Sequence, residues 1–188
     1  MDALEAIFTR QSISSVRPDP IPRELVERLL SAAVQAPNHY HARPWRFVVL
    51  QGTARERLGD LLASILQSAH PDLPPAALDK ERAKPLRAPL VIAVGVAKAE
   101  DPREVAIEDV CAAAAACQNL LLAAHALGLA ARWRTGEAAA DSRVKTFLGL
   151  DPGQPLIAFL YIGFPLNGQL TPPQRPSFED RALFLDSR

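Results

Sequence analysis

The sequence predicts an α+β fold that forms a single domain. Four short runs have the composition of β-strands, and the helical segments between them do not follow the regular strand–helix alternation of a doubly wound α/β fold. A length of 188 residues suits one domain better than two. Apolar residues make up 48% and charged residues 22%, which is typical of a globular chain with its own core.

The first half of the chain contains four expected helices and two expected strands. Residues 2–9 form a short helix, and the apolar side chains between Pro22 and Val34 recur at helical spacing. Pro22 suits a first helical turn, and Pro37 biases Ala36 away from helical angles. The remaining elements are a strand at 47–50 closed by Gly52, a helix at 53–70, a short helix before Pro85, and a buried strand at 89–96.

The second half is organised around a long alanine-rich helix, expected at about 105–127 and ended by Gly128. Its apolar stretch is nearly as long as a membrane span. Gln118 and Asn119 lie in the middle of that stretch, so we expect a helix buried in the protein or in a dimer. A strand at 130–133, a short helix at 141–148 ended by Gly149, and a strand at 156–162 follow.

The segment 165–188 differs from the rest of the chain. It is rich in proline as far as Pro176, and then carries Phe178, Leu183, Phe184 and Leu185. A solvated tail is not expected to hold such an apolar end. We therefore predict an arm that docks on its own subunit or on a partner.

Charge and cysteine content exclude several classes of protein. The 21 basic and 21 acidic residues cancel, which argues against general binding to nucleic acid or to anionic membranes. Cys111 and Cys117 lie six residues apart in one expected helix and do not share a face, so no disulfide is expected between them. The acidic N-terminus does not resemble a signal peptide, and a cytoplasmic location is expected.

No common catalytic motif is present, so a bound cofactor would have to be held by scattered side chains. The sequence contains no GxSxG, HExxH, Walker A or GxGxxG pattern. The run Arg10-Gln11-Ser12 offers a guanidinium and a hydroxyl that suit a phosphate. Taken alone, an arginine at the end of a helix is usually a solvated cap, and Arg10 by itself is a weak signal for a phosphate site.

Two further segments combine polar and aromatic residues. The stretch 36–45 is bounded by prolines and predicts a rigid ligand-binding loop; a metal site at His39 and His41 is disfavoured because no third ligand is close by in sequence. The run Trp133-Arg134-Thr135-Gly136 ends a strand, where side chains often face a pocket, and Arg134 suits an anionic or π-rich ligand. The alternative for Arg134 is an exposed strand end.

In combination, these segments resemble the nitroreductase family. The resemblance covers nearly the whole chain and depends on the order and spacing of six segments. They are Arg10-Gln11-Ser12, the stretch from Ala36-Pro37-Asn38-His39 to Phe47, Arg87-Ala88-Pro89, the stretch from Gln118 to Leu129, Trp133-Arg134-Thr135-Gly136, and the last strand from Ala158 to Pro165. The short connection between Leu62 and Pro85 looks most like the small bacterial members.

The resemblance implies an α+β sandwich around a mainly antiparallel sheet, completed by homodimerisation, with the 165–188 arm lying over the partner. It implies an FMN-dependent oxidoreductase that uses NAD(P)H to reduce nitroaromatics, quinones or similar small-molecule acceptors in ping-pong order. The flavin, rather than a catalytic residue, carries the chemistry. Its implied contacts are Arg10, Gln11 and Ser12 at the phosphate, Gln35, Pro37, Asn38 and His39 from the other subunit, and Trp133, Arg134 and Thr135. A cation, Arg10 or Arg134, would stabilise the reduced flavin.

Some positions depart from the family pattern. Gln11 and Ser14 stand where basic residues are common, so phosphate contacts are fewer unless Arg17 replaces them. Ala131 and Arg132 stand where glycines are often found, which would reshape the pocket. The alternatives are a specialised member such as a dehalogenase or ene-reductase, a flavin-binding protein of this fold without turnover, and a helical interaction module without a cofactor.

Overall fold

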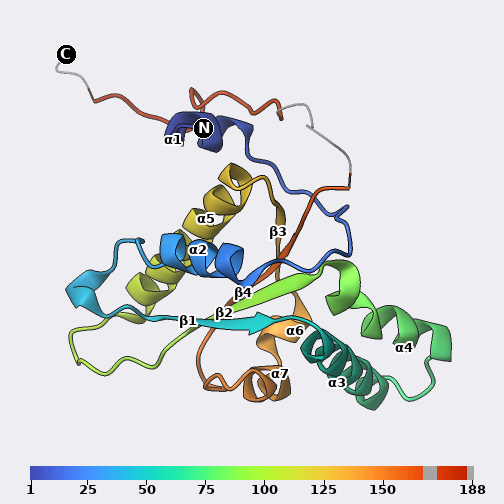
Figure 1. Cartoon of the computed structure of the whole chain (residues 1–188). Helices are drawn as coiled ribbons and strands as arrows, with labels where there is room; N and C mark the ends of the chain where they lie inside the picture. Colours follow the sequence, from blue (N-terminus) through green and yellow to red (C-terminus); the bar gives the residue numbers. More distant parts are fainter. Residues whose placement is uncertain (167–172, 186–188) are drawn as a thin grey trace.

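The computed structural model describes residues 1–166 and 173–185. At its centre is one four-stranded sheet with the strand order β1-β2-β4-β3 (Figure 1). The strands are β1 (Trp45–Leu50), β2 (Leu90–Val96), β3 (Ala130–Arg134) and β4 (Leu156–Gly163). All three neighbouring pairs are antiparallel, so the predicted α+β class and mainly antiparallel sheet are confirmed. β3 is an edge strand, and its outer side is therefore open to other segments.

Helices cover both faces of this sheet. They are α1 (Ala3–Thr9), α2 (Arg23–Ala33), α3 (Thr53–Ala69), α4 (Pro75–Arg82), α5 (Ala106–Ala126), α6 (Glu137–Ala140) and α7 (Ser142–Phe147), with 3₁₀ turns η1 (His39–His41) and η2 (Lys84–Arg87). α2 and α5 pack on one face, and α3, α6 and α7 pack on the other (Figure 1). Alternate side chains of β2 enter the two cores, which explains why this strand is apolar throughout.

The predicted elements are all present, with shifted ends. β1 begins at Trp45, two residues earlier than predicted, because the pairing with β2 continues as far as Trp45 and Val96. α5 ends as expected at Gly128, which has φ of 72°. The amide of Leu129 donates to the carbonyl of Ala124 and the amide of Gly128 donates to that of His125, the bond pattern of a Schellman motif. The short α6 and η1 were not predicted, because three or four residues show no periodicity.

α5 is the one described helix that is long and apolar enough to cross a membrane. A core helix of a soluble protein passes the same test, and α5 packs on the sheet and on α2. Its buried Cys117 and exposed Cys111 are both free, as predicted. Burial raises the pKa of the Cys117 thiol to about 12, so this cysteine is an apolar packing group.

Two segments far apart in sequence meet beside α1. The chain after α1 runs along β3, where Ser12 forms a parallel bridge with Ala131. The described part of the arm, residues 173–185, passes α1 (Figure 1), and Arg175 Nη2 donates to the carbonyl oxygen of Arg10 at 3.0 Å. Residues 167–172 and 186–188 of the predicted 165–188 arm lie outside the described residues.

Candidate functional site

A cavity of about 700 Å³ opens where β3 ends. One wall is apolar and comes from α3, with Leu58, Leu62 and Ile65 among its residues. The opposite wall is polar and includes Trp133, Arg134 and Thr135. These three predicted site residues therefore do border a cavity, and its volume lies within the range of cofactor and small-molecule sites.

The side chains of Trp133 and Arg134 nevertheless point to opposite faces of the sheet. Trp133 packs against the core on the α5 side and its indole Nε1 donates to the carbonyl of Ile157 at 3.1 Å. Arg134 lies on the α3 side, with its guanidinium carbon 5.5 Å from the centre of the Tyr161 ring. This separation follows from strand alternation. Trp133 therefore supports the wall, and Arg134 is the residue of the two that can meet a ligand.

The guanidinium of Arg134 has a hydrogen-bond donor that is available for a ligand. Its Nε is buried and has no hydrogen-bond partner among the described residues. Burial, followed by the charges of Arg132 and Arg87, lowers the pKa of Arg134. A buried donor without a partner is costly unless an anion or a hydrogen-bond acceptor arrives. This donor suits the electron-rich edge of a flavin.

A second basic group lies near the start of the chain. Arg10 is half-buried, and burial followed by the charge of Arg175 lowers its pKa. Ser12 is exposed two residues later, beside β3, and Gln11 is half-buried between them. Arg10 therefore has a second guanidinium, that of Arg175, nearby, and the hydroxyl of Ser12 follows two residues later beside β3; these groups are suitable chemistry for a phosphate.

Arg175 was not among the predicted site residues. The sequence predicted that its segment docks, but a single arginine among prolines gave no signal that it would meet Arg10. Arg17, the proposed substitute for the missing basic residues, lies 3.6 Å from a carboxylate oxygen of Asp19 and packs over Phe164. The structure thus shows Arg175, rather than Arg17, beside Arg10.

The loop between α2 and β1 is held in one conformation by its own contacts. The side-chain oxygen of Asn38 accepts from the amide of Arg43 at 3.0 Å, and its nitrogen donates to the carbonyl of Ala36. Tyr40, His41 and Arg43 have positive φ angles of 48°, 57° and 49°. Such angles are unfavourable outside glycine and often accompany functional sites.

This loop borders a second cavity, of about 600 Å³, that Pro37, Asn38 and His39 share with the start of α5. His39 Nδ1 lies 3.7 Å from a carboxylate oxygen of Glu108. Gln35 is exposed and its side chain donates to the carbonyl of Ser31 at 3.3 Å. No cluster of three metal-ligand side chains occurs within the described residues.

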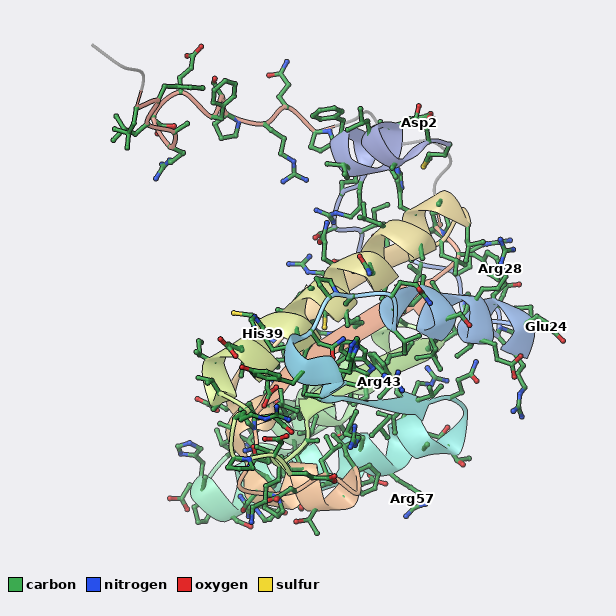
Figure 2. All side chains as sticks on the ribbon, turned by 90° about the vertical axis from the view of Figure 1, so that its left-hand side faces the viewer. Asp2, Glu24, Arg28, His39, Arg43 and Arg57 are labelled. Carbon is green, nitrogen blue, oxygen red and sulfur yellow. The ribbon has the colours of Figure 1, made fainter. Side chains whose placement is uncertain are left out.

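One chain does not bring the two predicted halves of the site together. Thr9, next to Arg10, contacts His125 at the end of α5, whereas His39 lies by Glu108 at its start. At 1.5 Å per residue these ends are roughly 25 Å apart. In Figure 2, His39 and Arg43 lie on the loop, away from Asp2, which caps the start of α1. Arg10, Ser12 and β3 form one group, and Gln35 to His39 form another.

Comparisons with known proteins agree on one family. The family model described as "Nitroreductase family" matches residues 7–164. YdjA of Escherichia coli K12, named as a proposed NAD(P)H nitroreductase, is 36% identical over 88% of this chain and 89% of its own. A nitroreductase-like protein from Bacillus cereus has the same fold, with a TM-score of 0.81, 24% identity, and coverage of 100% of this chain and 97% of its own.

A third similar protein was crystallised with a flavin. It is described as a proposed nitroreductase from Desulfovibrio desulfuricans in complex with FMN. Its TM-score is 0.73 at 26% identity, and the match covers 100% of this chain and 98% of that one.

Proposed function

The chain belongs to the nitroreductase family, and we propose that it is an FMN-dependent NAD(P)H oxidoreductase that reduces nitroaromatics, quinones or similar electron-poor acceptors. The observation that carries this proposal is the cavity at the end of β3, where the buried Nε of Arg134 has no partner among the described residues. The FMN complex of the relative from Desulfovibrio desulfuricans supports the choice of cofactor.

The residues present fit FMN in two places, one near the start of the chain and one at the end of β3. Arg10, with Ser12 and Arg175, would hold the phosphate. Arg134 would donate to the electron-rich edge of the ring system and stabilise negative charge there. The segment after α1 runs along β3 and so connects Arg10 to the strand that ends at the cavity; a single extended cofactor would lie beside this segment.

When bound, FMN supplies the redox chemistry by accepting hydride from NAD(P)H and passing two electrons to the second substrate in ping-pong order. The chain itself would bind and orient the reactants. The apolar wall from α3 would exclude water from the ring system, and Thr135 and Gly136 would border the end of the pocket.

We propose that the enzyme is a homodimer in which the second subunit supplies Gln35, Pro37, Asn38 and His39. The distance between the two groups along α5 favours this arrangement, because two α5 helices packed antiparallel would bring one subunit's loop to the other's Arg10. Apolar side chains are exposed on α1 and on the arm, among them Phe8 (67%) and Phe184 (72%). These surfaces fit the proposed docking of the 165–188 arm on the partner.

The test is the visible spectrum of the purified protein after incubation with FMN and desalting, followed by anaerobic addition of NAD(P)H. A retained flavin band that bleaches, and that recovers when a quinone is added, is the expected result. A retained band that does not bleach would favour a flavin-binding protein without turnover. If no band is retained, the cofactor assignment is wrong, and the family relationship then supports the fold alone.

A further inference from the structure

The polar wall of the large cavity carries more positive charge than one flavin edge requires. Arg87, at the end of η2, joins Arg132 and Arg134 from β3, and all three border both the large cavity and an adjoining hollow of about 10 Å³. Arg132 and Arg134 are two residues apart on one strand, so their side chains share a face. Tyr161, which pairs with Arg132 across the strands, lies among them.

No carboxylate in the described part of the chain forms an ion pair with any of these three arginines. Other basic groups of the same cavity are neutralised, Lys84 by Glu81 and Arg143 by Asp141. Arg132 donates to the neutral hydroxyl of Ser14, and Arg87 is an exposed residue. Like charges held this close repel each other, which favours binding of an anion.

These arginines form a site separate from the proposed phosphate site. Arg10 lies beside Thr9 and His125, at the end of α5, and α5 covers one face of the sheet. Arg132 and Arg134 point to the other face, toward Tyr161. FMN has one phosphate, and Arg134 alone is sufficient for its ring edge. Arg87 and Arg132 therefore remain available for a different anionic group.

The wall opposite the arginines is apolar. Leu58, Leu62, Ile65 and Leu66 of α3 line it. A ligand that satisfies both walls has an apolar body and one anionic end. A planar oxyanion such as a carboxylate matches the fork geometry of guanidinium groups.

We propose that Arg87 and Arg132 bind an anionic group, such as a carboxylate, on the electron acceptor. This inference depends on the proposed function, because it names the substrate class of the same site. The inference predicts that an aromatic acceptor bearing a carboxylate is reduced more efficiently than its neutral counterpart.

The test compares 4-nitrobenzoate with 4-nitrobenzamide, which differ mainly in charge, as acceptors for the FMN-saturated protein. The variants are Arg87→Gln and Arg132→Gln. Arg143→Gln is the control, because it removes the same charge from the same cavity at a position that Asp141 already neutralises. We expect the ratio of kcat/KM, benzoate over benzamide, to fall about tenfold in each test variant and to stay near the wild-type value in the control.

A second measurement does not depend on turnover. The dissociation constant of benzoate, which the flavin does not reduce, is determined by calorimetry with and without FMN, and we expect it to rise in Arg87→Gln and Arg132→Gln. Equal ratios and equal benzoate affinities in all variants would overturn the inference. So would a loss of FMN affinity with an unchanged ratio, since the two arginines would then hold the flavin. If the protein retains no FMN, the proposed function fails, and benzoate binding still decides the anion site.

Discussion

Arg175 in the C-terminal arm donates a 3.0 Å hydrogen bond to the carbonyl oxygen of Arg10, 165 positions earlier in the chain. The contact places a second guanidinium beside the first, and the repulsion between them contributes to the lowered pKa of Arg10. Two guanidinium groups held near each other make a suitable site for an anion. In the proposed enzyme, that anion is the phosphate of FMN.

Replacement of Arg10 by alanine should weaken FMN binding by about 1.5–3 kcal/mol, the usual contribution of one charge-assisted hydrogen bond. The measurement is a fluorescence titration with FMN and, in parallel, with riboflavin, which lacks the phosphate. Riboflavin affinity should change little. Arg28→Ala, an exposed arginine of α2 seen in Figure 2, is the control for loss of one positive charge. Equal FMN affinity in wild type and Arg10→Ala would show that the phosphate lies elsewhere.

Replacement of Arg175 by alanine tests whether the arm takes part in the site. We expect a loss of FMN affinity of similar size, about 1.5–3 kcal/mol, again without an effect on riboflavin. If both arginines contact one phosphate, the double variant should lose a different amount from the sum of the single losses, because groups that share a ligand are coupled. Strict additivity, or no effect of Arg175→Ala, would show that the arm does not bind the same phosphate as Arg10.

The sequence predicted the fold well because its strongest patterns are local. The apolar run of β2 and the long alanine helix stopped by Gly128 can be recognised in short windows, and both appear as predicted. Element ends were less accurate, since the extension of β1 to Trp45 depends on its partner Val96. α6 and η1 are too short for any periodic signal.

The candidate site could be predicted in pieces but not as an assembly. The runs at Arg10 and Trp133 were identified from residue type, and the structure places their segments side by side along β3. Arg175 reaches Arg10, and Arg87 reaches the cavity at the end of β3, through contacts over long sequence distances, which no local pattern encodes. The opposite directions of Trp133 and Arg134 follow from strand alternation, which becomes decisive only when the strand is known to continue through Arg134.

His125 should make the stability of the flavin-free protein depend on pH. Burial, followed by the charge of Arg10, lowers the pKa of His125, while Glu5 opposes the shift. The unfolded state, with a pKa of about 6.5, therefore takes up the proton first as pH falls. The stabilising contribution of neutral His125 is fully present above about pH 6.5 and is lost as pH falls through the lower folded value.

The variant for this prediction is His125→Gln. Thr9 donates its hydroxyl proton to the carbonyl of Glu5 at 2.6 Å, so it accepts from His125 Nε2 at 2.7 Å, and a glutamine amide can keep that bond. Urea unfolding at pH 7 and pH 5 should show a larger decrease in the free energy of unfolding for wild type than for His125→Gln. Equal decreases would contradict the assigned role of His125.

A charge placed on the exposed apolar surface of α1 or of the arm should disrupt the proposed dimer. Phe8→Glu and Phe184→Glu each put a carboxylate where a partner subunit would need apolar contact. Light scattering after size-exclusion chromatography should give a dimer for wild type and a larger monomer fraction for both variants, with less retained FMN. Ser64→Glu, at an exposed position of α3, is the control and should remain dimeric. A wild-type monomer that retains FMN would refute the shared site.

In the Gly59→Ala variant, helix propensity and packing have opposite effects on the free energy of unfolding. Gly59 lies within α3, where alanine would ordinarily stabilise the helix by about 1 kcal/mol. A Cβ at this position would lie only 2.2 Å from the carbonyl oxygen of Arg82 in α4, and a backbone oxygen cannot turn aside as a flexible side chain can. Overpacking of this kind typically costs about 1–3 kcal/mol. After the gain of about 1 kcal/mol in helix propensity, we expect a net loss of up to about 2 kcal/mol in the free energy of unfolding.

Urea unfolding of Gly59→Ala and of the control Ser64→Ala measures the difference. Ser64 is an exposed residue of the same helix, so its replacement should be neutral or slightly stabilising. Because α4 leads directly into η2 and Arg87, the clash should also disturb the polar wall of the cavity and reduce the preference for an anionic acceptor. A stabilised Gly59→Ala variant would mean that α3 and α4 are not in close contact, and the position of Arg87 at the cavity would lose its support.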